Sequence, residues 1–248
     1  MKRLFVLLLI FTILCFIQGC SSDSDPNQTG KLNVYLTDAP GDYGEVNITF
    51  SNLSAHIDSE WVNVQIEPVT VNLLDFNNAK LFLLGSSDLR AGHYTQIRFS
   101  IESAEVVVKG KSYLLNVPSE KLKLGPQFTI NEGSTYELVL DFDVNRSVVE
   151  NGNGSFKLKP HIRVVPKALT GSISGQILNF DDMPIAYAIQ DGDTLTSAFP
   201  DSTGYFMLSY LAEGNYNISV KDTLSQLFNK SVDVTPGKDY SLEQITLK

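Results

Sequence analysis

The segment Tyr136-Glu137-Leu138-Val139-Leu140-Asp141-Phe142-Asp143 carries the clearest structural signal in this 248-residue chain. Starting at Tyr136, every second position of the segment is apolar. Because successive side chains of a β-strand point to opposite faces, this alternation predicts a strand with one face in a hydrophobic core. The same geometry places Asp141 and Asp143 together on the face opposite Leu140 and Phe142.

The same two-residue period recurs along the chain after residue 30, whereas helical periodicity is nearly absent, so the chain is predicted to be all-β. A phase slip near Ser51-Asn52 predicts a β-bulge, and Lys109-Gly110-Lys111 predicts a hairpin turn. Pro160 cannot donate a ladder hydrogen bond and predicts an edge strand or a break. One short helical piece is expected over residues 77–84. The remaining alternating runs cover residues 32–36, 46–50, 53–57, 62–66, 69–73, 97–101, 106–108, 113–117 and 156–164.

Pro166-Lys167-Ala168-Leu169-Thr170-Gly171 separates two stretches of this strand pattern. We expect one β-sandwich over residues 31–166 and a second, seven-stranded one over residues 171–248. The predicted architecture is therefore two tandem β-sandwich domains of the immunoglobulin-like or transthyretin-like kind. The expected strands of the second domain, besides one that begins at Ile173, lie at about residues 185–190, 194–199, 205–210, 215–221, 227–234 and 240–247.

The N-terminal residues have the pattern of a bacterial lipoprotein signal peptide. Lys2 and Arg3 precede the apolar residues 4–17, and Gly19 precedes Cys20. This apolar run is shorter than the roughly 20 residues that span a membrane, and it matches a signal-peptide core. We expect cleavage between Gly19 and Cys20, which removes residues 1–19, and lipidation of Cys20 with palmitate-type chains. Residues 20–30 are expected to form a flexible acidic tether. The alternative is a plain secretory signal in which Cys20 has no special role.

Location and composition restrict the partners. Ser21 directly after Cys20 resembles outer-membrane lipoproteins, so the expected location is the outer membrane, on its periplasmic face or at the cell surface. Removal of Lys2 and Arg3 would leave 17 basic and 28 acidic residues, a net charge of −11. Such a chain repels nucleic acid, and no basic stripe compensates. The membrane is the expected partner through the anchor, and a protein or glycan partner and the oligomeric state stay open.

The second half resembles the carboxypeptidase regulatory-like (transthyretin-like) domain, through GSISGQI (residues 171–177), MPI (183–185), DSTGYFML (201–208) and LAEGNYNISV (211–220). This resemblance implies a structural or docking domain without catalytic residues. The first half resembles a family of bacterial lipoprotein domains of unknown function, through LTDAP (36–40), GHYTQIR (92–98), VPS (117–119), LDFD (140–143) and LKPHIRV (158–164). That resemblance implies a β-sandwich and supplies no activity.

Four carboxylates are the candidate metal ligands. Asp38 and Asp42 come from one turn, and Asp141 and Asp143 share one strand face, so together they would supply the oxygen ligands that Ca²⁺ prefers. The simpler interpretation, which we favour because no calcium-loop spacing is present, is that Asp38 caps its own turn. The other carboxylates are then solvated or paired with Arg98 or Arg163. No other cofactor is expected.

No catalytic motif is present, so no catalytic or cofactor-binding residue is assigned and the protein is predicted not to be an enzyme. His56, His93 and His161 lack metal-site spacing. Trp61 with Tyr35, Tyr43 and Tyr94 offers an aromatic sugar platform, although a lone tryptophan is usually a core residue. The sequence favours a lipid-anchored envelope protein with a non-catalytic binding or structural role. The alternatives are a glycan or peptide hydrolase that uses an unrecognised carboxylate pair, and a subunit of a surface adhesion or fibre assembly.

Overall fold

The computed structural model describes residues 28–39, 41–117, 121–178, 180, 183–222 and 227–247. The predicted signal peptide, its cleavage site at Gly19, the lipidation site at Cys20 and most of the tether lie outside the described residues. Within the described ranges, no helix is both long enough and apolar enough to cross a membrane.

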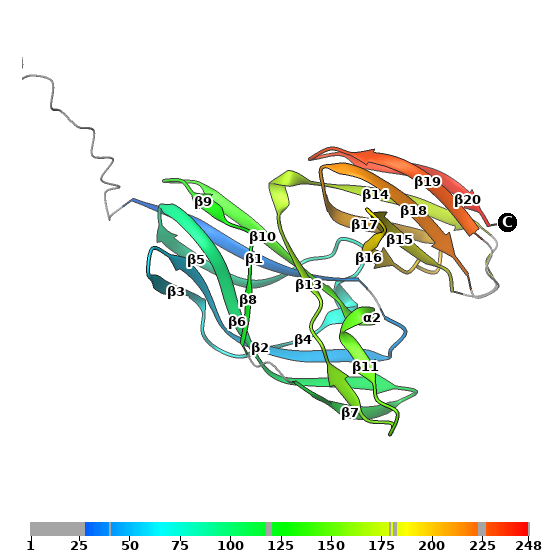
Figure 1. The fold of residues 1–248 in the computed structure, drawn as a ribbon, viewed down its shortest axis with the longest axis horizontal. Coiled ribbons are helices and arrows are strands. Elements are labelled where there is room, and N and C mark those ends of the chain that lie inside the picture. The colour runs from blue at the N-terminus through cyan, green and yellow to red at the C-terminus, as the bar shows by residue number, and fades with distance from the viewer. Residues whose placement is uncertain are drawn as a thin grey trace, which may run out of the picture.

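Strands make up nearly all of the regular structure (Figure 1). The few helical turns are short: η1 (Leu73–Phe76), α2 (Val144–Ser147) and η2 (Lys167–Leu169). The strands of the N-terminal half are β1 (Thr29–Ala39), β2 (Glu45–Ile57), β3 (Glu60–Gln65), β4 (Val69–Asn72), β5 (Phe82–Arg90), β6 (Gly92–Val108), β7 (Lys111–Asn116), β8 (Lys121–Leu124), β9 (Phe128–Ile130), β10 (Thr135–Asp143), β11 (Val148–Glu150), β12 (Phe156–Leu158) and β13 (Ile162–Pro166). Those of the C-terminal half are β14 (Thr170–Leu178), β15 (Ile185–Gln190), β16 (Asp193–Ala198), β17 (Tyr205–Ala212), β18 (Gly214–Lys221), β19 (Leu227–Val234) and β20 (Asp239–Thr246).

The first sandwich packs a four-stranded sheet, β13-β10-β1-β5, against a larger sheet, β11-β12-β7-β6-β2-β3, to which β4, β8 and β9 add. Residues 136–143 form nearly all of β10, which pairs in parallel with β1. Leu140 lies opposite Leu36, and both side chains are fully buried. Phe142 reaches the other sheet, where its ring lies 6.3 Å from that of Phe50 in an edge-to-face contact. This contact joins the two sheets through one core.

The second sandwich packs the sheet β17-β14-β20 against the sheet β16-β15-β18-β19. All seven strands occur where the alternating pattern placed them, within a few residues. Buried apolar residues form two separate clusters, one in each sandwich, and Phe206 and Tyr216 are the largest side chains of the second. The predicted all-β sandwich fold is confirmed.

Local predictions had mixed outcomes. The pairing register of β2 shifts between Ser51 and Ser54, as expected of a bulge, and Asn52 has a φ of 53°. Lys109 and Gly110 form a two-residue hairpin turn between β6 and β7. Pro160 falls in a break between β12 and β13. These predictions are confirmed.

The helix predicted over residues 77–84 is wrong. Asn78 and Ala79 both have positive φ values, of 50° and 67°, which no right-handed helix allows. The apolar residues that follow belong to β5, which pairs with β1, and the only helical turn nearby is η1 just before this segment. The hydrogen bonds of β5 with β1, and the contacts of its apolar side chains with the core, outweigh the weak helix preference of residues 77–84.

Candidate functional site

The second sandwich meets the first through two of its outermost strands (Figure 1). β17 ends the three-stranded sheet and β16 ends the four-stranded sheet, so each strand has one side without a strand partner among the described residues. An open edge leaves backbone N–H and C=O groups without ladder bonds, which natural proteins usually cover. Here the first sandwich covers both edges, and we call this region the junction.

Side chains and backbone groups of the first sandwich form hydrogen bonds with the open edge of β17. The turn residue Asn78 accepts a hydrogen bond on Oδ1 from the backbone N–H of Met207, at 3.1 Å. The hydroxyl of Tyr210 donates to the carbonyl of Ala79, the other positive-φ residue of this turn, at 2.9 Å. The guanidinium of Arg163 donates to the carbonyls of Ser209 and Tyr210. The turn at Asn78-Ala79, where a helix was expected, thus forms one side of the junction.

The edge of β16 is bound in the same way. Arg146, from the short helix α2, donates from Nη1 to the carbonyl of Thr194 at 2.6 Å. Asp143 begins that helix: its Oδ1 accepts from the backbone N–H of Arg146 at 2.9 Å, and its side chain is 7% exposed. Burial raises the pKa of Asp143 to about 6, against the lowering effect of the Arg146 backbone bond and charge. The cap therefore places a carboxylate that holds its proton unusually tightly beside the junction.

Asp141 and Arg163 form the charged centre of the junction. They lie opposite each other on β10 and β13, with Nη2 and Oδ2 2.6 Å apart, and their side chains are 5% and 19% exposed. Arg163 thereby binds a carboxylate of its own sandwich and two carbonyls of the other with one guanidinium. Breaking such a buried pair on one side leaves an uncompensated charge, which is strongly destabilising.

Asp38 is the third buried acid of the junction. One oxygen accepts from the backbone N–H of Val144 at 3.2 Å, and the other has no partner among the described residues. Burial raises the pKa of Asp38 well above its usual range, and the nearby charges of Asp141 and Asp143 raise it further. The surroundings of Asp38 therefore favour its protonated form more than water does.

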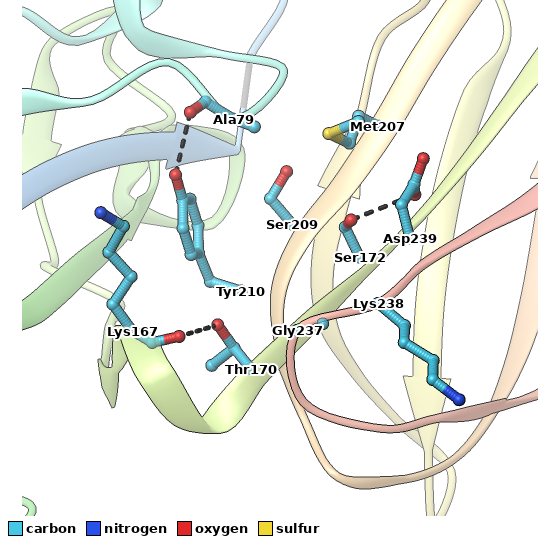
Figure 2. Close-up of a pocket in the computed structure, with 11 residues that line it drawn as sticks. Ala79, Lys167, Thr170, Ser172, Met207, Ser209, Tyr210, Gly237, Lys238 and Asp239 are labelled. Carbon is cyan, nitrogen blue, oxygen red and sulfur yellow. Dashed lines mark hydrogen bonds between the residues drawn. The ribbon is translucent and has the colours of Figure 1, made fainter.

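A groove opens beside these contacts (Figure 2). Figure 2 shows the Tyr210 hydroxyl turned to Ala79, and Ser172 bonded to Asp239 at 3.1 Å. Lys167 is held by Glu137, 3.2 Å away, and the Lys238 ammonium points out of the groove in this view. The polar groups of this wall mostly bond to one another, which is the arrangement of an interface.

Comparison with known proteins places the first sandwich in a family. Residues 29–160 match the model of the domain of unknown function DUF4382. The chain belongs to the DUF4382 family. No curated protein matches it.

Solved structures show only remote likeness to this DUF4382 chain. The Bacillus anthracis TIE protein is 12% identical with a TM-score of 0.28; the match covers 90% of this chain and 34% of that one, so the chain spans about a third of its length. The minor pilin GBS52 of Streptococcus agalactiae is 10% identical over 88% of this chain and 95% of that one, with a TM-score of 0.23. The shaft pilin SpaA of Lactobacillus rhamnosus GG is 10% identical over 89% and 97%, with a TM-score of 0.27.

The four carboxylates predicted as calcium ligands do not form one cluster. Asp42 is exposed, whereas Asp38, Asp141 and Asp143 are buried at the junction, each with a different protein partner. Among the described residues, no three His, Cys, Asp or Glu side chains are placed to hold a metal ion. The expected pairing of a carboxylate with Arg163 is confirmed for Asp141. The expected cap of Asp38 on its own turn is wrong, because its backbone partner is Val144, on another strand connection.

The alternative of an aromatic platform is not borne out, and Trp61 is not a core residue either. Tyr94 is fully buried and donates to the carbonyl of Arg90, and Tyr43 packs against the core. Tyr35 lies under the Lys167 ammonium near the junction. Trp61 lies instead on the outer face of the large sheet, where Arg98 covers its ring.

Little in the sequence predicts the junction residues. The sequence indicates Arg163 only as one of two candidate partners for a carboxylate, and no pattern marks Asn78, Arg146 or Tyr210. Met207 and Asn78 are 129 residues apart in the chain. The one local signal was the Asn77-Asn78 pair, a composition that favours turns.

Proposed function

We propose that this DUF4382 protein is a non-catalytic structural module of the cell envelope, in which two β-sandwiches act as one stiff unit. The observation that supports it is the capping of β16 and β17 by Asn78, Arg146 and Arg163. Inter-domain contacts in a chain are by default loose, and relative motion is expected unless the interface is well made. Here rotation would strip hydrogen bonds from two sheet edges and expose the pair of Asp141 and Arg163.

The carboxylates at the junction argue for structure rather than hydrolysis. Asp141 and Asp143 are both buried, so a glycan or peptide chain has no access to a pair made from them. Asp141 is bound to Arg163 and Asp143 caps α2. A hydrolytic pair needs instead a separation that leaves room for the substrate or a water molecule.

Stiffness is measured by small-angle X-ray scattering together with ¹⁵N relaxation of the mature chain carrying Cys20→Ser. The proposal predicts one rotational correlation time for both sandwiches and a maximum dimension that does not change with salt. In Arg163→Gln with Asn78→Ala, the two sandwiches should tumble separately. Separate tumbling of the unmodified chain would refute the proposal.

We further propose that the module is attached to the outer membrane through lipid on Cys20, with the second sandwich as a regulatory-like spacer or docking domain. The support is the sequence pattern around Gly19-Cys20 and the polar residues that follow it. In cells, Cys20→Ser should move the protein from the membrane to the soluble fraction. Protease added to intact cells distinguishes the cell surface from the periplasmic face, since only surface protein is cleaved.

A surface-fibre subunit is the second candidate, and the edges of β19 and β20 favour it. β19 pairs with β18 and β20 with β14, and neither has a second neighbour among the described strands. An added strand from another copy is the usual partner of such an edge. Concentration-dependent oligomers in light scattering would support this candidate, and a monomer at the highest soluble concentration would exclude it.

A further inference from the structure

A groove on the outer face of the large sheet lies apart from the junction. β2, β3, β6 and β8 form its floor. Its described lining combines amide, hydroxyl and cationic side chains and contains no carboxylate. The lining residues are Asn52, Ser54, Asn63, Arg98, Phe99, Ser100 and Lys121.

The groove concentrates positive charge on an acidic protein. Arg98 lies directly opposite Lys123 in the pairing of β6 with β8, and Ser100 lies opposite Lys121. None of these three cations forms an ion pair with a described residue, although the whole chain has a net charge of −9. Like charges directly opposite across two strands are destabilising. Stability of the fold therefore gives no reason for this arrangement.

The ring of Trp61 positions the guanidinium of Arg98. The Arg98 guanidinium carbon lies 4.1 Å from the centre of the indole ring, and the Lys123 ammonium lies 5.8 Å from it. His56 packs beside the same ring, at 4.9 Å between centroids, and its Nδ1 is 2.7 Å from the Thr95 hydroxyl. Trp61 thus offsets part of the repulsion between the two cations and restricts the guanidinium to one side of the groove.

The neutral groups of the groove are suited to sugar hydroxyls. Asn52 projects from the β-bulge with a φ of 53° and is exposed. The Ser54 hydroxyl lies 3.2 Å from the Asn52 carbonyl and 3.4 Å from Asn63 Oδ1, and it can donate to either. The Asn63 amide N–H groups have no acceptor among the described residues. The Ser100 hydroxyl and the Arg98 guanidinium likewise have no described hydrogen-bond partner. A ligand would therefore find several donors that no described residue uses.

We propose that this groove binds an acidic saccharide, a sugar chain that carries carboxylates. Arg98 and Lys121 bind the carboxylate, because a guanidinium offers paired N–H donors that match its two oxygens. Asn52, Asn63 and Ser100 bind the hydroxyls of the same or the next sugar. A bare inorganic anion would pair only with the cations. A saccharide would in addition form hydrogen bonds with the neutral groups, so these groups favour the saccharide. The site would give the structural module a ligand and does not depend on stiffness at the junction.

Isothermal titration of the mature chain carrying Cys20→Ser, with tetragalacturonate as probe, tests this proposal. The matched neutral probe is the fully methyl-esterified tetrasaccharide, and inorganic phosphate at equal ionic strength is the competitor. We expect binding of the acid form, no binding of the ester and no displacement by phosphate. Arg98→Gln should weaken binding about tenfold or more, the usual effect of losing a charged hydrogen bond.

Three further variants distinguish binding at this site from a general effect of charge. Lys111→Gln removes an exposed lysine that also lies over a ring, that of Tyr113 at 5.0 Å, and should leave binding unchanged. Trp61→Leu should weaken binding while Trp61→Phe restores most of it, as expected of a positioning residue. Unchanged thermal midpoints show that the variants fold. Equal binding of the ester, full competition by phosphate, an unaffected Arg98→Gln, or no heat at millimolar probe would each overturn the proposal without bearing on the junction.

Discussion

The guanidinium of Arg163 donates to the carboxylate of Asp141 at 2.6 Å and, from the same group, to the backbone carbonyl of Tyr210 in the other sandwich. A side chain that neutralises a buried acid in one domain thus also completes the sheet edge of the next. The stability of the first sandwich and its attachment to the second are therefore coupled through one residue.

Arg163→Ala should lower the free energy of unfolding by about 3–5 kcal/mol, because it leaves the Asp141 carboxylate buried without its partner. The double variant Asp141→Asn with Arg163→Gln should lose less, since no charge then stays buried. Urea denaturation of both variants measures the difference. The control is Arg90→Ala at the exposed pair with Asp58, whose side chains are 41% and 72% exposed; it should cost less than about 1 kcal/mol. Equal losses at the two sites would contradict the buried-pair argument.

Asp143 should make stability depend on pH. Burial raises its pKa from 3.8 to about 6, so the folded state binds the proton more tightly than the unfolded state. Its stabilising contribution is therefore fully present below about pH 4 and is lost as pH rises through about 6. Asp143→Asn keeps an N-cap oxygen for Arg146 and removes this titration.

As pH rises from 4 to 7, the free energy of unfolding of Asp143→Asn should therefore increase relative to that of the unmodified protein, by an amount on the order of 1–3 kcal/mol. Urea denaturation across this pH range measures the difference. Asp42→Asn, at an exposed carboxylate outside the junction, serves as the control and should leave stability unchanged. A constant difference between Asp143→Asn and the unmodified protein at every pH would show that burial of Asp143 does not control its proton.

The strands could be predicted from the sequence because their signal is local. In β10, Leu138, Leu140 and Phe142 occupy alternate positions and are all fully buried, as their two-residue period predicts. The turn at Lys109-Gly110 is equally local, because Gly110 adopts the positive φ that a tight hairpin turn requires. The parallel pairing of β1 with β10 has no local signal, because more than 90 residues separate the two strands.

The candidate site was predictable only in part, for the same reason. The face of Asp141 and Asp143 follows from strand geometry, but the pattern does not say that a second domain covers that face. A carboxylate on a solvated strand face suggests a metal ligand. A carboxylate covered by Arg163 and Tyr210 is instead part of an interface. The contacts that decide between the two, such as that of Asn78 with Met207, join residues with no relation in sequence.

Tyr210→Phe should weaken the junction without disturbing either core. The variant removes the hydroxyl bond to the Ala79 carbonyl and should lower the free energy of unfolding by about 0.5–1.5 kcal/mol. Burial, with the charges of Asp141 and Glu137, raises the pKa of Tyr210 to about 12, so its contribution is complete below about pH 10 and is lost as pH rises through about 12. Burial also raises the pKa of other tyrosines, such as Tyr94 and Tyr216, so the late change in absorbance at 295 nm should be smaller in the variant by the amplitude of one tyrosine. An unchanged late amplitude in the variant would show that Tyr210 does not contribute to it.

Gly204 and Gly192 have nearly the same backbone conformation, with φ of 86° and 89°, but different surroundings. A Cβ at Gly204 would lie 2.1 Å from the carbonyl oxygen of Ile177, whereas nothing lies within 4 Å of one at Gly192. Both alanine variants bear the strain of positive φ, about 1–2 kcal/mol. Gly204→Ala must in addition displace β14 backbone and should lose about 1–3 kcal/mol more. Chemical denaturation of the two variants measures this steric contribution as the difference between their free energies of unfolding. Equal free energies for the two variants would contradict the close approach of Gly204 to the Ile177 carbonyl.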